Sequence, residues 1–239
     1  MSRGLSLPRF TLGLVLATLL VALSLGALTI GPFPLSARET LAALLGAGTP
    51  QSELVVHSIR VPRVVAALLV GAALAAAGAS YQTLFRNPLV SPDILGVSAG
   101  AGLGAVIGIF LSLPVAFIQL FAFAGGMAAV LLVMLVAAAV RNTDQVLALV
   151  LTGVVIGALA GAATSLLKVL ADPYDQLPAI TFWLLGSLAS TTSADILPAL
   201  PAVALGLVPL FLLRWRINVL SLGDDEARAL GVEAGRIRF

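Results

Sequence analysis

Six stretches of about 20 mostly apolar residues recur along this chain, and each is long enough to cross a bilayer as a helix. They cover approximately residues 11–30, 64–84, 94–113, 115–140, 146–170 and 196–213. Hydrophobic residues make up 60% of the 239 residues and charged residues only 10%, whereas a soluble domain carries about 25% charged residues. The sequence therefore predicts an all-α, polytopic membrane helix bundle, with one transmembrane domain over residues 1–239.

The distribution of basic residues predicts the orientation of these spans. With the amino terminus inside, only Arg38, Arg60, Arg63 and Lys168 of the 13 basic residues lie outside, as the positive-inside rule requires. The first stretch resembles a signal peptide, but its apolar run is longer and lacks a clean small-x-small cleavage site. We therefore expect a multi-pass protein of the cytoplasmic (inner) membrane with a cytoplasmic amino terminus.

Two spans carry glycines at regular spacing along one side of a helix. Because no hydrophobic effect draws helices together in lipid, such bare stripes allow the close backbone approach that packs them. We interpret both stripes as packing surfaces, with the lining of a pathway as the alternative. The residues are Gly96, Gly100, Gly104 and Gly108 in the third span, and Gly153, Gly157 and Gly161 in the fifth.

The spans lack ionisable residues near their midpoints, and the chain has no cysteine. Proton-coupled transporters usually need carboxylates or histidines at that depth. A hydrolase would need a nucleophile with a base, or a metal-binding cluster. We therefore expect no catalytic residue, no metal site and no cofactor.

Proline and arginine mark the loops on both sides. Outside, Arg60 and Arg63 bracket Pro62 before the second span, either as interfacial anchors or as a docking point for acidic residues of a partner. Also outside, residues 172–190 predict a short helix at the interface. Inside, Pro88 and Pro92 interrupt the helix, and we expect Ser91 or Asp93 to cap the third span.

Residues 220–232 predict a short polar helix on the cytoplasmic side. Gly223 breaks the preceding helix, Asp224 can cap the new one, and Gly231 can end it. Ala227 and Leu230 give it one small apolar face. Such a helix is too short to be stable alone, so we expect it to be held against a cytoplasmic partner.

Six separated blocks of sequence together resemble the FecCD-type permeases of bacterial ABC importers for iron-siderophores, haem and cobalamin. The resemblance implies an all-helical subunit of ten spans that pairs with a second permease subunit as a homodimer or heterodimer. It also implies a periplasmic or lipid-anchored substrate-binding protein and a cytoplasmic ATPase dimer. The blocks are Arg60-Val-Pro-Arg63, residues 69–78 with Gln82, Asn87-Pro-Leu89, residues 95–102, Phe182-Trp-Leu-Leu-Gly-Ser187 and residues 222–231.

The resemblance also implies roles for individual residues. Arg60 and Arg63 match the arginines that dock the binding protein. The short polar helix matches the coupling helix that lies in a groove of the ATPase, with Gly223, Asp224, Glu226, Ala227, Arg228, Leu230 and Gly231 as its residues. The inner gate falls on Asn142, Thr143, Val146 and Leu147.

Six spans fall short of the ten that the resemblance implies, so we expect the 239 residues to be a carboxyl-terminally incomplete permease. The leading prediction is transport of an iron chelate by alternating access driven by a partner ATPase. An ion-driven secondary transporter or channel remains the alternative, and a membrane scaffold is a third. Charge at mid-membrane would favour the ion-driven alternative.

Overall fold

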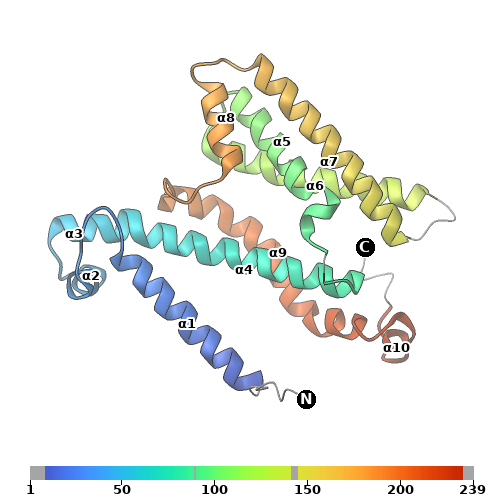
Figure 1. Cartoon of the computed structure of the whole chain (residues 1–239), viewed down its shortest axis with the longest axis horizontal. Helices are drawn as coiled ribbons and strands as arrows, with labels where there is room; N and C mark the ends of the chain where they lie inside the picture. The colour runs from blue at the N-terminus through green and yellow to red at the C-terminus, as the bar shows by residue number, and fades with distance from the viewer. Residues whose placement is uncertain (1–8, 89, 141–144, 234–239) are drawn as a thin grey trace, which may run out of the picture. The chain divides into compact units, whose positions relative to one another are not determined.

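A computed structural model describes residues 9–88, 90–140 and 145–233, and every regular element among them is helical. The all-α class is confirmed. In chain order the elements are α1 (Arg9–Thr29), α2 (Ala37–Leu44), α3 (Pro50–Val55), the π-helical turn η1 (Val56–Arg60), α4 (Val61–Phe85), the 3₁₀ turn η2 (Pro92–Leu95), α5 (Val97–Phe110), α6 (Val115–Ala139), α7 (Gln145–Leu170), α8 (Gln176–Leu185), α9 (Ser193–Leu220) and α10 (Asp224–Ala229) (Figure 1).

The chain forms two compact units, which are described separately. The first unit comprises residues 1–68 and 188–196, and the second comprises residues 69–187 and 197–239. The first contains α1, α2, α3, η1 and the start of α4. The second contains the rest of α4 and the elements from η2 to α8, most of α9, and α10.

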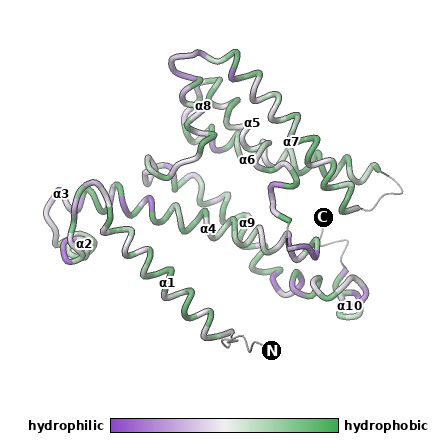
Figure 2. The backbone as a smooth tube through the Cα atoms, viewed as in Figure 1, coloured by the Kyte–Doolittle hydropathy of each residue, from purple (hydrophilic) through white to green (hydrophobic). Residues whose placement is uncertain are grey.

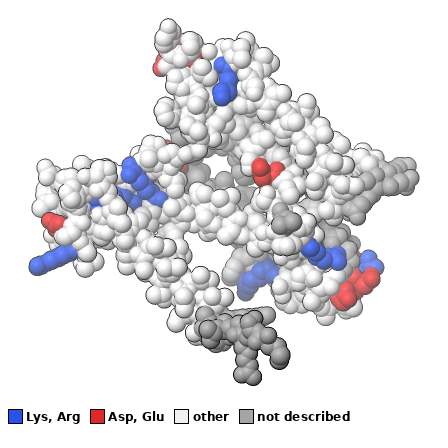
Figure 3. All heavy atoms as spheres, viewed as in Figure 1, with Lys and Arg blue, Asp and Glu red and all other residues white. Residues whose placement is uncertain are grey.

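Five helical segments within the described ranges are long and apolar enough to cross a membrane. They are Phe10–Thr29, Pro50–Phe85, Val115–Ala139, Val146–Leu170 and Ser193–Leu220. Figure 2 shows them coloured mainly as hydrophobic, and charged side chains form only small patches on the face in Figure 3. The third predicted span instead forms η2 and α5, which has 14 residues. Such a helix is about 21 Å long, less than the roughly 30 Å of a bilayer core, so the count of six spans is not confirmed.

α5 begins later than predicted because Gly96 turns the chain. Its φ of +69° lies in the left-handed region, which glycine adopts without steric cost. The Gly96 N–H donates to the Asp93 carbonyl oxygen at 2.8 Å and closes η2. Gly96, rather than Ser91 or Asp93, is the N-cap of α5, and Ser91 precedes η2 without a side-chain capping bond.

α5 and α6 approach each other backbone to backbone. A Cβ added at Gly104 would lie 2.0 Å from the carbonyl oxygen of Phe121. One added at Gly100 would lie 2.6 Å from the carbonyl oxygen of Gly125. Gly108 continues this contact, since a Cβ added there would lie 3.1 Å from the Cα of Ile118 in α6. Because real Cβ atoms essentially never come within 3.0 Å of such atoms, a side chain at Gly100 or Gly104 would push the helices apart.

The glycine stripe of α7 makes close contact only at its beginning. A Cβ added at Gly153 would lie 2.0 Å from the carbonyl oxygen of Ile94 in η2. At Gly157 it would be 3.9 Å from Gly96, which is ordinary contact, and at Gly161 no atom lies within 4 Å. The close approach of α7 is therefore to η2 and the start of α5.

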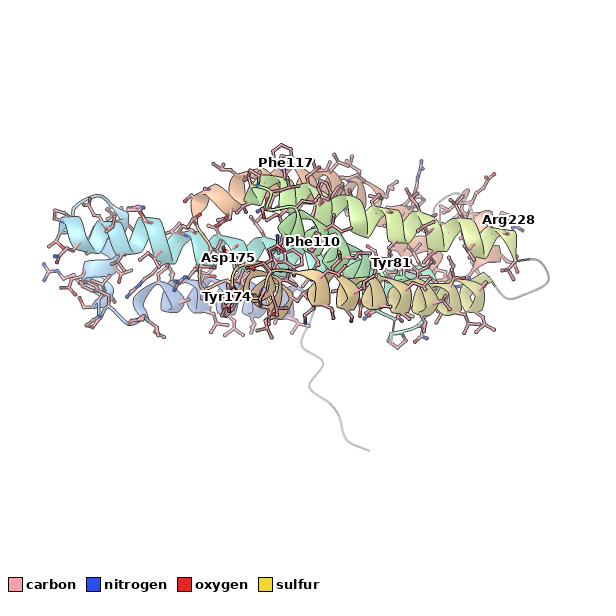
Figure 4. All side chains as sticks on the ribbon, turned by 90° about the horizontal axis from the view of Figure 1, so that it is seen from above. Tyr81, Phe110, Phe117, Tyr174, Asp175 and Arg228 are labelled. Carbon is pink, nitrogen blue, oxygen red and sulfur yellow. The ribbon has the colours of Figure 1, made fainter. Side chains whose placement is uncertain are left out.

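α8 is a short helix held at the carboxyl end of α5, within the segment predicted to contain one. The Gln176 side-chain Nε2 donates to the carbonyl oxygen of Phe110 at 2.8 Å, and Figure 4 labels Phe110. Ile180 is fully buried in an apolar cluster with the end of α5 and the residue after α7, made of Val106, Ile109 and Ala171. These contacts fix α8 on α5.

α9 is longer than the predicted sixth span and continues through three prolines, Pro198, Pro201 and Pro209. Proline removes a backbone donor, but membrane helices tolerate it where neighbouring groups satisfy the freed carbonyls. Near the carboxyl end of α9, the Arg214 guanidinium lies 4.0 Å from the centre of the Phe211 ring. The arginine thus stacks on the helix that carries it.

Replacement of Gly104 by alanine tests the backbone contact between α5 and α6. The added methyl group would meet the Phe121 carbonyl at 2.0 Å, so we expect Gly104→Ala to lower the free energy of unfolding by about 3 kcal/mol. Unfolding in SDS, followed by circular dichroism, measures the change. Gly161→Ala is the matched control, since it meets no atom within 4 Å, and it should stabilise by up to about 1 kcal/mol. Equal stability of the two variants would contradict the packing described.

Candidate functional site

The candidate outer residue Arg60 is buried and bonded to the end of another helix. It ends η1 and is only 5% exposed. Its Nη1 donates to the Leu28 carbonyl oxygen at 2.6 Å, and its Nη2 donates to the Phe33 carbonyl oxygen. The last carbonyls of a helix have no partner within it. Arg60 therefore fastens the carboxyl end of α1 to η1.

Two neighbouring features support this arrangement in the first unit. A Cβ added at Gly31 would lie 3.1 Å from Nη2 of Arg60, so the turn after α1 leaves little space beside the guanidinium. From the same π-helical turn, the His57 Nε2 lies 2.9 Å from the Ala43 carbonyl oxygen near the end of α2. Cationic or donor groups at helix carboxyl ends are stabilising. The turn thus ties two helices to the start of α4.

Arg63 has different surroundings from Arg60, although both lie within one turn of each other. It is partly exposed in the first turn of α4. Its Nε is buried and has no hydrogen-bond partner in the described part of the chain. A guanidinium binds carboxylates through several donors at once. Arg63 is partly accessible, but its buried Nε is not a donor that an external acidic group can reach.

A carboxylate on α2 adds a fixed negative charge to the first unit. The Ser36 hydroxyl and the Ser36 backbone N–H both donate to Glu39 Oε2, at 2.7 Å and 2.8 Å. These bonds, the hydroxyl first, lower the pKa of the Glu39 carboxyl. The Glu39 N–H donates in return to the Ser36 hydroxyl oxygen at 3.2 Å, completing a capping box.

The predicted inner helix is present as α10, but its start differs from the prediction. Gly223, with φ +139°, is the N-cap, and Asp224 is the first helical residue. The Glu226 carboxylate lies over Gly223, because a Cβ added there would fall 2.1 Å from its oxygen. An acidic side chain is favoured at this end of a helix. The expected cap by Asp224 is therefore wrong.

α10 ends at Gly231 in a Schellman motif. The Gly231 N–H donates to the Arg228 carbonyl oxygen at 3.0 Å, and the Val232 N–H to the Ala227 carbonyl oxygen at 2.8 Å. Gly231 has φ +78°, the left-handed conformation that this motif places after the helix. The sequence-based end of the helix is therefore confirmed.

The expected apolar face of α10 is divided between two environments. Ala227 is buried in an apolar cluster, called here the α10 cluster, made of Val219, Leu220, Ala227 and Val232. Leu84, in the last turn of α4, packs against it. Leu230 is instead 52% exposed and Leu222 61% exposed. Arg228, labelled in Figure 4, is also exposed.

The predicted inner gate is only partly described. Asn142 and Thr143 lie outside the described residues, and so does the side chain of Asp224. Val146 and Leu147, in the first turn of α7, are 38% and 50% exposed. The described gate residues are thus apolar and accessible.

The described residues of the second unit line apolar surfaces. One groove of about 580 Å³ lies between α6, Trp183 of α8 and the proline-containing start of α9, with Gln119 contributing an amide. No group of three or more His, Cys, Asp or Glu residues gathers anywhere in the ranges described. These surfaces can admit or pack a large solute, but they assemble no reactive group.

Three features of the structure were not predicted. Gly125 and Gly126 of α6 face α5, and their adjacent pair in mid-span was an available signal. The bonds from Arg60 to backbone carbonyls have no sequence signal, because any residue supplies a carbonyl. The contact of Leu84 with the α10 cluster joins segments far apart in the sequence.

Comparison with known proteins shows what this chain resembles. Residues 18–239 match the FecCD transport family. The chain is 43% identical over 185 residues, 77% of its length, to a Helicobacter pylori protein described as a probable iron chelatin transport system permease. It is 35% identical over 98% of its length to the molybdate import system permease protein MolB of Haemophilus influenzae. The aligned regions cover 55% and 70% of those proteins.

A solved structure has the same fold. It is the inward-facing conformation of a transporter assigned to the metal-chelate type of ABC transporters, with a TM-score of 0.82 and 34% sequence identity. The match covers 97% of this chain and 70% of the solved chain. The arrangement of helices is therefore that of an ABC permease.

Alanine at position 231 tests the end of α10. A side chain there must adopt φ +78°, which costs about 1 kcal/mol, and nothing within 4 Å adds a clash. We expect the Val232 amide, which closes the motif, to exchange with solvent about fivefold faster in Gly231→Ala. Hydrogen exchange read by mass spectrometry measures it. Gly206→Ala in α9, also without a neighbour within 4 Å, should leave this amide unchanged. An unaltered Val232 rate in Gly231→Ala would refute the motif.

Proposed function

The chain belongs to the FecCD transport family, and we propose that it is a permease subunit of an ATP-binding-cassette importer for an iron-siderophore or a related metal chelate. Substrate would cross the cytoplasmic membrane by alternating access. ATP would be hydrolysed by a separate partner, and this chain would have no catalytic role. The observation that carries the proposal is the family match over residues 18–239.

We propose α10 as the coupling helix that docks on the cytoplasmic ATPase. Its buried Ala227 and the Schellman motif at Gly231 hold it in place. Leu230 and Leu222 remain exposed beside Arg228 and Glu226. An apolar side chain ringed by charged groups suits a protein interface. Gly223 and Asp224 would form the start of the same contact.

We propose Arg60 and Arg63 as residues that dock an external substrate-binding protein. Arg63 is partly exposed, whereas Arg60 is only 5% exposed, so Arg63 is the more accessible of the two. Arg60 would contribute to docking indirectly, by holding the turn η1 in place, because its guanidinium already donates to two backbone carbonyls. Acidic groups on the partner would complement this charge.

We propose that substrate passes between this chain and a second permease subunit, identical or related. The inner gate would lie at Asn142, Thr143, Val146 and Leu147. The exposure of Val146 and Leu147 supports this. The apolar groove surfaces fit a large chelate better than a small ion, which would need polar ligands.

The orientation proposed is a cytoplasmic amino terminus, supported by nine of 13 basic residues on the inner side. This orientation requires α5 to cross the membrane, although α5 is short. Together, η2 and α5 form a mostly helical segment over residues 92–110. An iron chelate is proposed as substrate from the names of relatives, which also include a molybdate permease.

Coupled uptake tests the proposed function. Proteoliposomes containing this chain, a partner permease subunit, the ATPase and the binding protein should accumulate a ferric siderophore only with ATP. Leu230→Ser should reduce uptake about tenfold, because an interface leucine contributes about 1.5 kcal/mol or more. Leu45→Ser is the control, since Leu45 is also an exposed C-cap leucine, at the end of α2. ATP-independent uptake, or no loss in Leu230→Ser, would oppose the proposal.

Charge reversal tests the docking residues. Arg63→Glu should weaken binding of the substrate-binding protein about tenfold at low salt, and less at high salt because ions screen the pair. Arg38→Glu is the control for net charge in the same unit. Binding is measured by surface plasmon resonance on the permease complex in nanodiscs. If Arg63→Glu and Arg38→Glu behave alike, Arg63 is an anchor rather than a docking residue.

A further inference from the structure

The side chain of Leu84 joins α4 to the proposed coupling helix α10 by apolar packing. This residue lies in the last turn of α4 and is partly buried against the α10 cluster. The cluster contains two residues from the end of α9, Val219 and Leu220, and two from α10 and its cap, Ala227 and Val232. α10 therefore packs on the end of α9, which precedes it in the chain, and on Leu84 of α4, which is far from it in the sequence.

The end of α4 beside Leu84 is closed by its own cap. The Arg86 N–H donates to the Thr83 carbonyl oxygen at 3.2 Å, and the Asn87 N–H to the Gln82 carbonyl oxygen at 3.1 Å. Arg86 adopts φ +49° to make this turn, a conformation that costs a residue with a side chain about 1 kcal/mol. The last turn of α4 is thus held in one conformation, and Leu84 with it.

On the other side of the contact, α10 depends on the cluster for its position. A helix of six residues is too short to be stable alone. Ala227 and Leu220 are fully buried, and Val232 is 4% exposed. Removal of an apolar side chain from such a cluster leaves a cavity and weakens the packing of the remaining side chains. Leu84 is the partner that α4 supplies.

A groove separates part of α4 from α9. Small side chains on α4, Ala76 and Ala79 among them, face Leu210 and Phe211 of α9 across a groove of about 310 Å³. The groove leaves α4 and α9 loosely packed as far as Thr83 and Asn218, whereas Leu84 packs on the apolar α10 cluster. Leu84 is therefore an apolar contact through which a displacement of α10 would reach α4.

We propose that Leu84 is a positioning residue that makes α4 move together with the coupling helix α10. The inference rests on the proposed function of α10 as the contact with the ATPase. Motion of α10 then passes to α4 by packing and to α9 through the chain. Because α4 is one uninterrupted helix from Val61 to Phe85, the helix that receives this motion also carries Arg63.

Truncation of the contact tests the proposal in the reconstituted complex. Leu84→Ala should lower the amount of ferric siderophore imported per ATP hydrolysed about tenfold. Leu84→Met preserves the volume and should restore the ratio to within about twofold. Leu74→Ala, on the same helix but 63% exposed, is the control and should not change it. An unchanged ratio in Leu84→Ala would overturn the proposal, whereas wild-type protein without ATP-driven uptake would instead overturn the proposed function.

A cross-link tests the same idea by replacing the packing contact with a covalent link. The chain has no cysteine, so Leu84→Cys with Val232→Cys can be joined by a short bifunctional thiol reagent. If α4 and α10 move together, the cross-linked protein should keep at least about half of the uptake of the unlinked double variant, because a twofold change is under about 0.5 kcal/mol. Loss of uptake on cross-linking, with the single variant Leu84→Cys unaffected by the reagent, would show that they separate and would overturn the proposal.

Discussion

The close approach of α5 to α6 through glycine is the contact on which the second unit depends. Lipid supplies no hydrophobic force between helices, so association comes from van der Waals packing at short range. Gly100, Gly104 and Gly125 permit that range. The paired helices then present η2 to Gly153 of α7, and α5 presents its carboxyl end to Ile180 of α8. The contacts of α7 and α8 in this unit are therefore made with the α5 and α6 pair or with η2 before it.

The sequence predicted the packing face of α5 but not where α5 begins. A repeat of four residues marks one side of a helix, so Gly100 and Gly104 could be assigned from spacing alone. The starts of α5 and α10 follow positive φ angles at Gly96 and Gly223, and these depend on the path of the preceding chain. Arg60 shows a further limit, because its acceptors at Leu28 and Phe33 lie about 30 residues away and are backbone carbonyls.

The residues proposed to act in transport lie at the ends of helices. Arg63 precedes the apolar part of α4, Val146 and Leu147 begin α7, and Leu230 follows α10. The stretches between them are built from small and aliphatic side chains that pack or line grooves. Such an arrangement suits a protein whose helices change position relative to one another, while partners that recognise substrate or hydrolyse ATP bind at the helix ends.

Accessibility of two positions to a membrane-impermeant maleimide tests the central claim, a permease with its coupling helix in the cytoplasm. Leu54, before α4, and Leu230, after α10, are 64% and 52% exposed, and the chain has no cysteine of its own. α4, α5, α6, α7 and α9 separate them, so they lie on opposite sides only if short α5 crosses the membrane. We expect Leu54→Cys to be labelled in spheroplasts and Leu230→Cys only after permeabilisation. Labelling of both from the same side would contradict the account.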